Sequence, residues 1–415
     1  MRTRAFFAVA ASGLLAALLA TPPATGWAPM TPAGSPVVRP AIARTEQITP
    51  VTAEPTTVPL PVKATDGRTH LVYELELTNM STLPATLTAV RVTAGEGTLE
   101  ELSGARLLRV FRPSGAPAEQ PARDTVLQPG RQGRVWLDVL VPAGTAFPIT
   151  LAHAVSVTYP EALGIIPKTM TENVAPLGVP DRRPVVLRPP LAGGGWLDAN
   201  GCCATITAHR SAASPVDGRS RFGERFAIDF VRLDHGTVLF DGPPDQVGSY
   251  PYYGTPVRAA ADGRIVSVTD EYPDKKPGSA TPDMPLAQYA GNNVVQQLAS
   301  GEYVLYAHLK PGSTRVLAGS TVKAGEVLGA LGSSGNSDAP HLHFEVMSAT
   351  SPFTSEGLPF VFSSFELEGT VTPNAFDDAL ASGSGSITVT PAREDRDRTR
   401  EMPLYLDVLR FPRTA

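Results

Sequence analysis

Pro340-His-Leu-His-Phe-Glu-Val346 is the stretch that says most about how this chain folds. In a β-strand, successive side chains point to opposite faces, so His341, His343 and Glu345 would share one face. The apolar residues between them form a second face, which we expect to lie in a core. The strand would then present two imidazoles to one cleft. Imidazole and carboxylate are the ligand types of a catalytic zinc, and the sequence has no HExxH motif, which excludes the helical zincin arrangement.

Two stretches upstream show the same alternating pattern. Tyr303-Val-Leu-Tyr-Ala-His-Leu309 predicts a strand with Tyr306 and His308 on one face. Arg225-Phe-Ala-Ile-Asp-Phe-Val231 predicts a strand whose bulky apolar residues point inward, with Asp229 on the opposite face. A carboxylate between such residues is more than a random surface charge. These surroundings strengthen the interpretation of the two imidazoles as part of a metal site.

The composition favours β-rich domains and argues against binding to nucleic acid. A length of 415 residues suggests two or three domains, and 42% hydrophobic residues against 18% charged ones suffice for packed cores. Proline occurs 41 times, about twice the usual ~5%, which disfavours helix interiors. The 35 Lys and Arg against 40 Asp and Glu give a net charge of −5, without the basic excess that nucleic acid attracts.

The two cysteines, Cys202 and Cys203, are adjacent. This excludes a scaffold of several disulfides and a CxxC zinc ribbon. A reduced pair, a disulfide between the two neighbours and an intermolecular bridge remain open, and we expect the reduced pair.

The N-terminus predicts a secretory signal peptide over residues 1–26. Arg2 and Arg4 precede an apolar run from Phe6 to Ala20, and small residues and prolines follow. The run is shorter than the ~20 apolar residues of a membrane span. We therefore expect an exported protein, extracellular or associated with the cell wall (periplasmic if the cell has an outer membrane). It would have no stable membrane span after signal removal; an uncleaved anchor is the alternative.

Strand patterns and proline-rich segments divide the rest of the chain. Alternating runs at 70–77, 135–141 and 151–159, separated by Gly and Pro turns, predict a β-sandwich. Its two histidines, His70 and His153, have no neighbours typical of metal ligands and are expected to be structural. The expected order is a signal peptide at 1–26, a Pro/Thr-rich tether at 27–61, the β-sandwich at 62–171, a linker at 172–192, a second β domain at 193–370 and a C-terminal extension with a closing strand at 371–415.

The second domain resembles the lysostaphin-type (LytM-like) zinc endopeptidases, which cut peptide bonds in bacterial peptidoglycan. The resemblance covers roughly residues 205–350. It rests on motifs in the family's order: Gly254-Thr-Pro-Val257, Ala261-Asp-Gly-Arg-Ile-Val266, Gly291-Asn-Asn-Val294, Tyr306-Ala-His-Leu309, Gly325-Glu-Val-Leu-Gly329 and Pro340-His-Leu-His-Phe-Glu-Val346. It implies an all-β fold, in which the N-terminal β-sandwich is followed by an antiparallel β-sheet LytM-like peptidase domain of the duplicated hybrid motif type. Tyr306 and Asn292 lie in these motifs and are expected to bind substrate.

The resemblance also implies a role for each polar residue of the cleft. Asp229 and His343 resemble metal ligands. His341 resembles the catalytic histidine that activates the metal-bound water, and His308 resembles the second catalytic histidine, which stabilises the tetrahedral intermediate. The function implied is that of an exported zinc metalloendopeptidase with one Zn²⁺ per chain, which acts on peptidoglycan peptides.

One position departs from the family's pattern. The family commonly places its first histidine ligand four residues before the aspartate, where this chain has Arg225, which offers zinc no lone pair. Upstream of Asp229 the nearest histidine is His209, and Pro and Gly residues in between allow the chain to turn back. His235 would lie about 20 Å from Asp229 if the strand continued. We therefore predict His209, Asp229 and His343 as zinc ligands, with water fourth; a surface position for His209 is the alternative.

The main alternative function is that of a catalytically weak or inactive LytM-like regulator or binding protein of other cell-wall hydrolases. The presence of Asp229, His308, His341 and His343 favours the enzyme. The predicted sandwich is interpreted as a spacer by default, with wall binding or blocking of the cleft as alternatives. The sequence does not indicate an oligomeric state.

Overall fold

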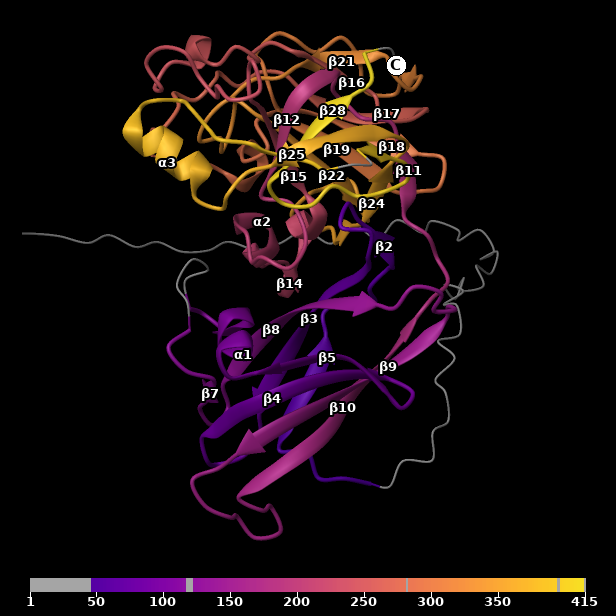
Figure 1. Ribbon diagram of the computed structural model, residues 1–415, viewed down its shortest axis with the longest axis vertical. Coiled ribbons are helices and arrows are strands. Elements are labelled where there is room, and N and C mark those ends of the chain that lie inside the picture. Colours follow the sequence, from indigo (N-terminus) through magenta and orange to yellow (C-terminus); the bar gives the residue numbers. More distant parts are fainter. Residues whose placement is uncertain (1–45, 117–121, 281–282, 394–395, 414–415) are drawn as a thin grey trace, which may run out of the picture. The chain divides into compact units, whose positions relative to one another are not determined.

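The computed structural model describes residues 46–116, 122–280, 283–393 and 396–413. The predicted signal peptide at 1–26 and most of the predicted tether lie outside these residues. Strands far outnumber helices among the elements described, as the all-β prediction requires (Figure 1). None of the helices in these four ranges has the length and apolar character needed to cross a membrane.

Two antiparallel sheets form the N-terminal part. In the first, β1 (Val51–Pro55), β3 (Thr69–Asn79), β8 (Gln132–Val141) and β6 (Phe111–Pro113) are neighbours in that order, and β2 (Val62–Lys63) pairs with β3. In the second, the order is β10 (Thr169–Val179), β9 (Ile149–Thr158), β4 (Ala85–Ala94) and β5 (Gly97–Ser103), and β7 (Val126–Leu127) pairs with β4. The helix α1 (Gly104–Val110) follows β5. The alternating apolar residues of β3 and β8 belong to one core cluster: Leu71, Tyr73, Leu75, Leu77, Val135, Leu137, Val139 and Val141. We call this part the N-terminal sandwich.

The N-terminal sandwich extends beyond the boundaries expected from the sequence. β1 lies in the segment expected to be a tether, and β10 runs into the segment expected to be a linker. Glu172, within β10, is fully buried, and its Oε2 accepts a hydrogen bond from the backbone N–H of Val51 at 2.9 Å. Prolines made both segments resemble linkers. Both strands lie at sheet edges, however, where the missing N–H of proline is tolerated.

A twelve-stranded sheet organises the described residues between 185 and 413, which we call the C-terminal region. Its strand order is β20–β17–β18–β19–β22–β15–β12–β28–β25–β26, with β23 paired to β22 and β27 to β25. These strands are β12 (Gly193–Ala199), β15 (Ile228–Arg232), β17 (Gly263–Thr269), β18 (Asn292–Leu298), β19 (Tyr303–Leu309), β20 (Thr321–Val322), β22 (Leu342–Met347), β23 (Gly357–Leu358), β25 (Phe365–Thr370), β26 (Thr390–Pro391), β27 (Asp397–Arg398) and β28 (Asp407–Phe411). The predicted closing strand is present as β28, between β12 and β25.

Smaller elements complete the C-terminal region. Three strand pairs lie outside the large sheet: β11 (Val185–Leu187) with β24 (Phe360–Phe362), β13 (Ser214–Val216) with β14 (Arg219–Arg221), and β16 (Pro256–Arg258) with β21 (Val327–Ala330). The helical elements are α2 (Ala208–Ser211), η1 (Gly223–Phe226), η2 (Val247–Ser249), η3 (Leu286–Gln288) and α3 (Ala375–Ser382), of which the η elements are 3₁₀-helices.

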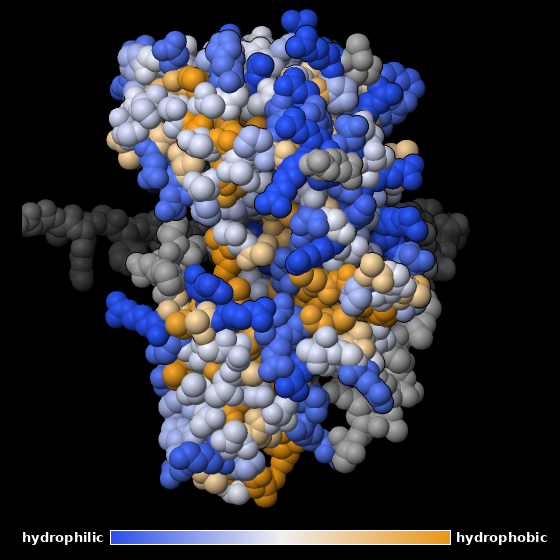
Figure 2. Space-filling model, viewed as in Figure 1, coloured by the Kyte–Doolittle hydropathy of each residue, from blue (hydrophilic) through white to orange (hydrophobic). Residues whose placement is uncertain are grey.

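The inward-facing residues predicted for β15 and β22 lie in the core of this region. Ile228 and Phe230 of β15 are buried there beside Leu342, Phe344 and Val346 of β22. On the face seen in Figure 2, hydrophilic residues are widespread and hydrophobic patches lie between them. The apolar side chains of β15 and β22 thus pack in the core, and the polar side chains at the alternate positions face the opposite side of the sheet.

Cys202 and Cys203 form a disulfide with each other, which corrects the expectation of a reduced pair. Both side chains are buried in the core of the C-terminal region, where they turn toward one another. The pair lies between β12 and α2.

Candidate metal centre

Three neighbouring strands carry most of the polar residues predicted for the site. β22 lies between β15 and β19, and the register places Asp229 of β15 and Ala307 of β19 on either side of His343. His341 lies immediately before β22, where it forms an isolated bridge with Gly332. The sheet therefore brings together residues that are far apart in the sequence.

His209, Asp229 and His343 converge on one point. Their ligand atoms lie within 4.8 Å of one another. The Nε2 of His209 is 3.2 Å from the Oδ2 of Asp229, and the Nδ1 of His343 is 3.0 Å from the Oδ1. Ligand atoms about 2.0 Å from a tetrahedral zinc are about 3.3 Å from each other, so these spacings fit zinc. Two imidazoles and one carboxylate also leave a fourth position for water, as catalytic zinc sites do.

His209 reaches Asp229 from the short helix α2. The helix begins after Thr207, whose Oγ1 accepts a hydrogen bond from the backbone N–H of Arg210 at 3.2 Å. The Nδ1 of His209 is 3.0 Å from the carbonyl oxygen of Ala227. Because a carbonyl can only accept, Nδ1 carries a proton, and in the neutral ring Nε2 has the lone pair that a metal ion needs.

Neither of the other two residues considered for this ligand reaches the cleft. The side chain of His235 is 89% exposed, in the turn after β15. The guanidinium of Arg225 instead donates to Glu74 of the N-terminal sandwich, at 2.8 Å from Nη2. The structure thus brings His209, and not His235, to Asp229.

His341 and His308 face the same cleft. The Nδ1 of His341 is 2.8 Å from the carbonyl oxygen of Ala339, and the Nδ1 of His308 is 2.8 Å from that of Ser334. Each ring therefore donates from Nδ1, and in its neutral form it has its lone pair on Nε2. The two ring centres are 4.6 Å apart, and the Nε2 of His341 is 3.4 Å from the Oδ1 of Asp229.

The groups of the cleft shift one another's pKa values in opposite directions. Burial and the charges of His341 and His343 lower the pKa of His308 well below its usual value. Burial also opposes a charge on His343, but its hydrogen bonds to carboxylates, above all to Asp229, raise its pKa well above the usual value. Burial opposes the ionisation of Asp229, yet His209 and His341 hold its pKa well below the usual range. Asp229 is therefore an ionised carboxylate, the form that binds a cation.

β19 departs from the predicted alternation at His308. This residue has a φ of 60°, in the left-handed region, so its side chain does not follow the alternation of the strand. Tyr306 points into the core, where its hydroxyl donates to Gln296 at 2.7 Å and accepts from the N–H of Ala260 at 2.7 Å. Tyr306 is fully buried, so it does not share a face with His308 or occupy the predicted substrate-binding position.

Asn292 is also a structural residue rather than a substrate contact. It is fully buried, and its Nδ2 donates to the carbonyl oxygens of Tyr272 at 2.7 Å and Leu309 at 3.2 Å. Its Oδ1 accepts from the N–H of Tyr272 at 2.8 Å. The side chain thereby fastens the loop after β17 to the end of β19.

The cleft around the metal centre is open and has a volume of about 430 Å³. Its lining includes residues that the sequence analysis missed: Glu224, Tyr289, Phe353 and Phe376. The rings of Tyr289 and Phe353 meet edge to face, with centres 6.0 Å apart. Because these residues lie in loops and short helices without alternation, periodicity gives no signal for them.

Comparison with known proteins identifies part of this region. Residues 249–355 match Peptidase family M23. This segment contains His308, His341 and His343, whereas His209 and Asp229 precede it. The assignment of the two preceding residues therefore depends on the geometry described above.

Two characterised proteins and one solved structure illustrate the similarity. The DD-carboxypeptidase/endopeptidase Mpg of Neisseria gonorrhoeae is 41% identical over 92 residues, which cover 22% of this chain and 17% of that protein. Lysostaphin of Staphylococcus simulans is 32% identical over 126 residues, which cover 29% of this chain and 22% of lysostaphin. The structure of the catalytic domain of Staphylococcus simulans lysostaphin aligns with 23% identity and a TM-score of 0.22, over 40% of this chain and 88% of that domain. The chain thus spans less than a quarter of the length of either characterised relative, and it carries a Peptidase family M23 domain of the lysostaphin (LytM-like) type.

Proposed function

We propose that this chain is an exported zinc metalloendopeptidase that hydrolyses peptide bonds of bacterial peptidoglycan. The observation that carries the proposal is the convergence of His209, Asp229 and His343 beside two further histidines in one cleft. The lysostaphin-type resemblance supplies the substrate class, and the predicted signal peptide supplies the export. The relative Mpg is named as a carboxypeptidase and endopeptidase, which supports peptide-bond hydrolysis.

The residues present fit a zinc ion. His209 would hold it through Nε2, Asp229 through a carboxylate oxygen and His343 through Nδ1. Zinc, when bound, lowers the pKa of a water molecule to about 7 and polarises the scissile carbonyl.

In this proposal, His341 moves the proton during hydrolysis. Its Nδ1 donates to Ala339, so in the neutral ring Nε2 carries the lone pair that would accept a proton from the attacking water and return it to the leaving amine. His308 holds a second Nε2 beside it, since its own Nδ1 donates to Ser334. The negative charge of the tetrahedral intermediate would offset the lowered pKa of His308, and a proton on that Nε2 would then stabilise the intermediate.

Purified full-length protein, supplied with zinc, tests this proposal on cell-wall preparations of several cross-link types. We expect new amino termini to be released, and a chelator to stop the release. Soluble fragments without new amino termini would indicate cleavage of glycan. A zinc-bound protein that releases nothing from any wall would favour the non-catalytic regulator.

A further inference from the structure

The outer face of the first sheet of the N-terminal sandwich is buried. One face of β3 and β8 packs into the core of the sandwich, and the other carries Val72, Glu74 and Trp136, which are 0%, 0% and 5% exposed. Val72 belongs to the core cluster of the C-terminal region. The second face of an antiparallel sheet is commonly solvated. This face is instead an interface with the C-terminal region, so the sandwich is more than the spacer expected from the sequence.

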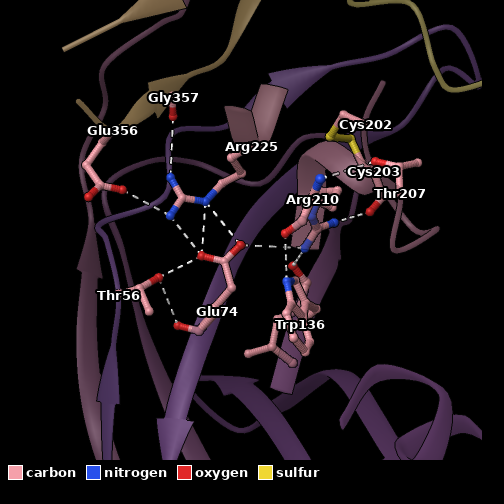
Figure 3. A network of polar contacts seen from close by, with 11 residues as sticks. Thr56, Glu74, Trp136, Cys202, Cys203, Thr207, Arg210, Arg225, Glu356 and Gly357 are labelled. Carbon is pink, nitrogen blue, oxygen red and sulfur yellow. Dashed lines mark hydrogen bonds and ion pairs between the residues drawn. A yellow bond between two sulfur atoms is a disulfide. The ribbon is translucent and has the colours of Figure 1, made fainter. Parts of the chain in front are cut away.

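Glu74 lies at the centre of this interface (Figure 3). Its Oε2 accepts hydrogen bonds from the Nε of Arg225 at 3.0 Å, the Nη2 of Arg225 at 2.8 Å and the hydroxyl of Thr56 at 2.7 Å. The Nη2 of Arg210 lies 3.9 Å from Oε1, and both arginine side chains are only 1% exposed. Burial opposes the charge of Glu74, but Arg225 lowers its pKa, so the carboxylate is ionised. Glu74 is therefore a counter-charge for two buried arginines.

These arginines lie beside the residues that form the metal centre. Arg210 follows His209 in α2, and Arg225 belongs to η1, which leads through Ala227 into β15. The Nδ1 of His209 donates to the carbonyl of Ala227, so the two segments meet at the ligand itself. One carboxylate of the sandwich thus holds both segments that orient His209.

The helix α2 cannot orient His209 alone. It has four residues, far fewer than the ~12 that an isolated helix needs for stability. A second contact with the sandwich holds it in place, because the Nε1 of Trp136 donates to the carbonyl oxygen of Arg210 at 2.8 Å. On the other side, Arg210 donates from Nη1 to the carbonyl of Cys203. The direction of the His209 ring therefore depends on contacts outside the helix.

We propose that Glu74 is a positioning residue of the metal centre, and that the N-terminal sandwich is a structural part of the active site. Arg225 then serves as an anchor between the two regions, while His209 supplies the ligand from α2. A neutral residue at position 74 leaves two buried arginines without this counter-charge, which loosens α2 and η1. The inference rests on the proposed zinc function.

The experiment measures the zinc dissociation constant of the full chain by competition with a chromophoric chelator, on proteins whose fold is checked by circular dichroism. We expect Glu74→Gln to weaken zinc binding about 10- to 100-fold, as loss of a supporting contact to a ligand does. Two controls should stay within about twofold of wild type, since neither contacts α2 or η1. Glu172→Gln removes a buried carboxylate that accepts from Val51 within the sandwich. Lys63→Met removes an ion pair with Glu401, elsewhere between the two regions.

If Glu74→Gln does not fold, a milder variant tests the same inference. Trp136→Phe keeps the ring but loses the N–H that holds Arg210, and should weaken zinc binding by about fivefold. Wild-type affinity in a folded Glu74→Gln protein, or in Trp136→Phe where it replaces that variant, overturns the inference. Equal weakening in Glu172→Gln or Lys63→Met overturns it as well, because the effect would then be general loosening. A wild-type chain that binds no zinc instead overturns the proposed function, and the inference with it.

Discussion

At the scale of single residues, His341 and His343 have different hydrogen-bond partners although one residue separates them. The Nδ1 of His343 faces Asp229 at 3.0 Å, whereas the Nδ1 of His341 donates to a backbone carbonyl. We expect His343→Ala to lose zinc and activity together. His341→Ala should keep most of its zinc while its turnover falls about 10²- to 10⁴-fold, the contribution of one acid–base group. Metal content and rate, measured on the same samples, check this; equal zinc loss in both variants would reverse the assignment.

The first ligand is tested by a second pair of residues. His209 is buried with its Nε2 3.2 Å from Asp229, and His235 is exposed in a turn. His209→Ala should lose stoichiometric zinc because two ligands remain, while His235→Ala should bind one zinc per chain. Zinc stoichiometry after gel filtration provides the measurement. Full occupancy in His209→Ala would show that another residue is the ligand.

At the scale of elements, the alternation of apolar and polar residues predicted those strands that have one face in the core and one face outside it. β15 and β22 have one apolar face in the core and one polar face in the cleft, and both faces could be read from the sequence. In β19 the left-handed backbone of His308 breaks the pattern, and nothing in Ala-His-Leu indicates that conformation. The burial of Glu74 could not be predicted either, since alternation separates the faces of β3 without showing that another region covers the outer one. The backbone conformation of His308 and the burial of Glu74 both involve residues far apart in the sequence, which a local pattern does not show.

The contact between β10 and β1 predicts a pH dependence of stability. Burial raises the pKa of Glu172 from 4.5 to about 7, although hydrogen bonds from Val51 and Tyr159 oppose the shift. Between these pH values the folded chain holds a proton that the unfolded chain releases, so the free energy of unfolding falls as the pH rises. We expect a loss of about 1–3 kcal/mol between pH 5 and pH 7.5, measured by urea unfolding.

Glu172→Gln is the matched comparison, because the amide oxygen can still accept from Val51. Burial also raises the pKa of Asp407, to about 6. Asp407 therefore lowers the free energy of unfolding as the pH rises, and it does so equally in both proteins. The difference between wild type and variant therefore isolates Glu172. An identical pH dependence in the two proteins would contradict the raised pKa.

At the scale of the whole molecule, the described residues between 46 and 413 share contacts that should make them unfold together. Val62 and Val72 of the sandwich belong to the core cluster of the C-terminal region. The hydroxyl of Thr65 donates to Asp407 at 2.5 Å across the same interface. An interface with a common core and buried polar contacts favours a single cooperative transition, as in one domain. Stabilisation of the metal centre should then also reach strands that do not contact it.

Zinc provides the test of this coupling. An ion that binds only the native centre stabilises it by about 2.7 kcal/mol at 100 times its dissociation constant, which makes the globally open state about 100-fold less populated and slows amide exchange through it by the same factor. If the two regions unfold together, the slowest-exchanging amides of β9 in the sandwich must slow by the same factor as those of β22 beside the metal. Hydrogen exchange with and without zinc measures both, and His343→Ala, which lacks a ligand, should show no slowing in either strand. Slowing confined to β22 would mean that the sandwich opens independently, and the contacts through Glu74 would then join two separate folding units.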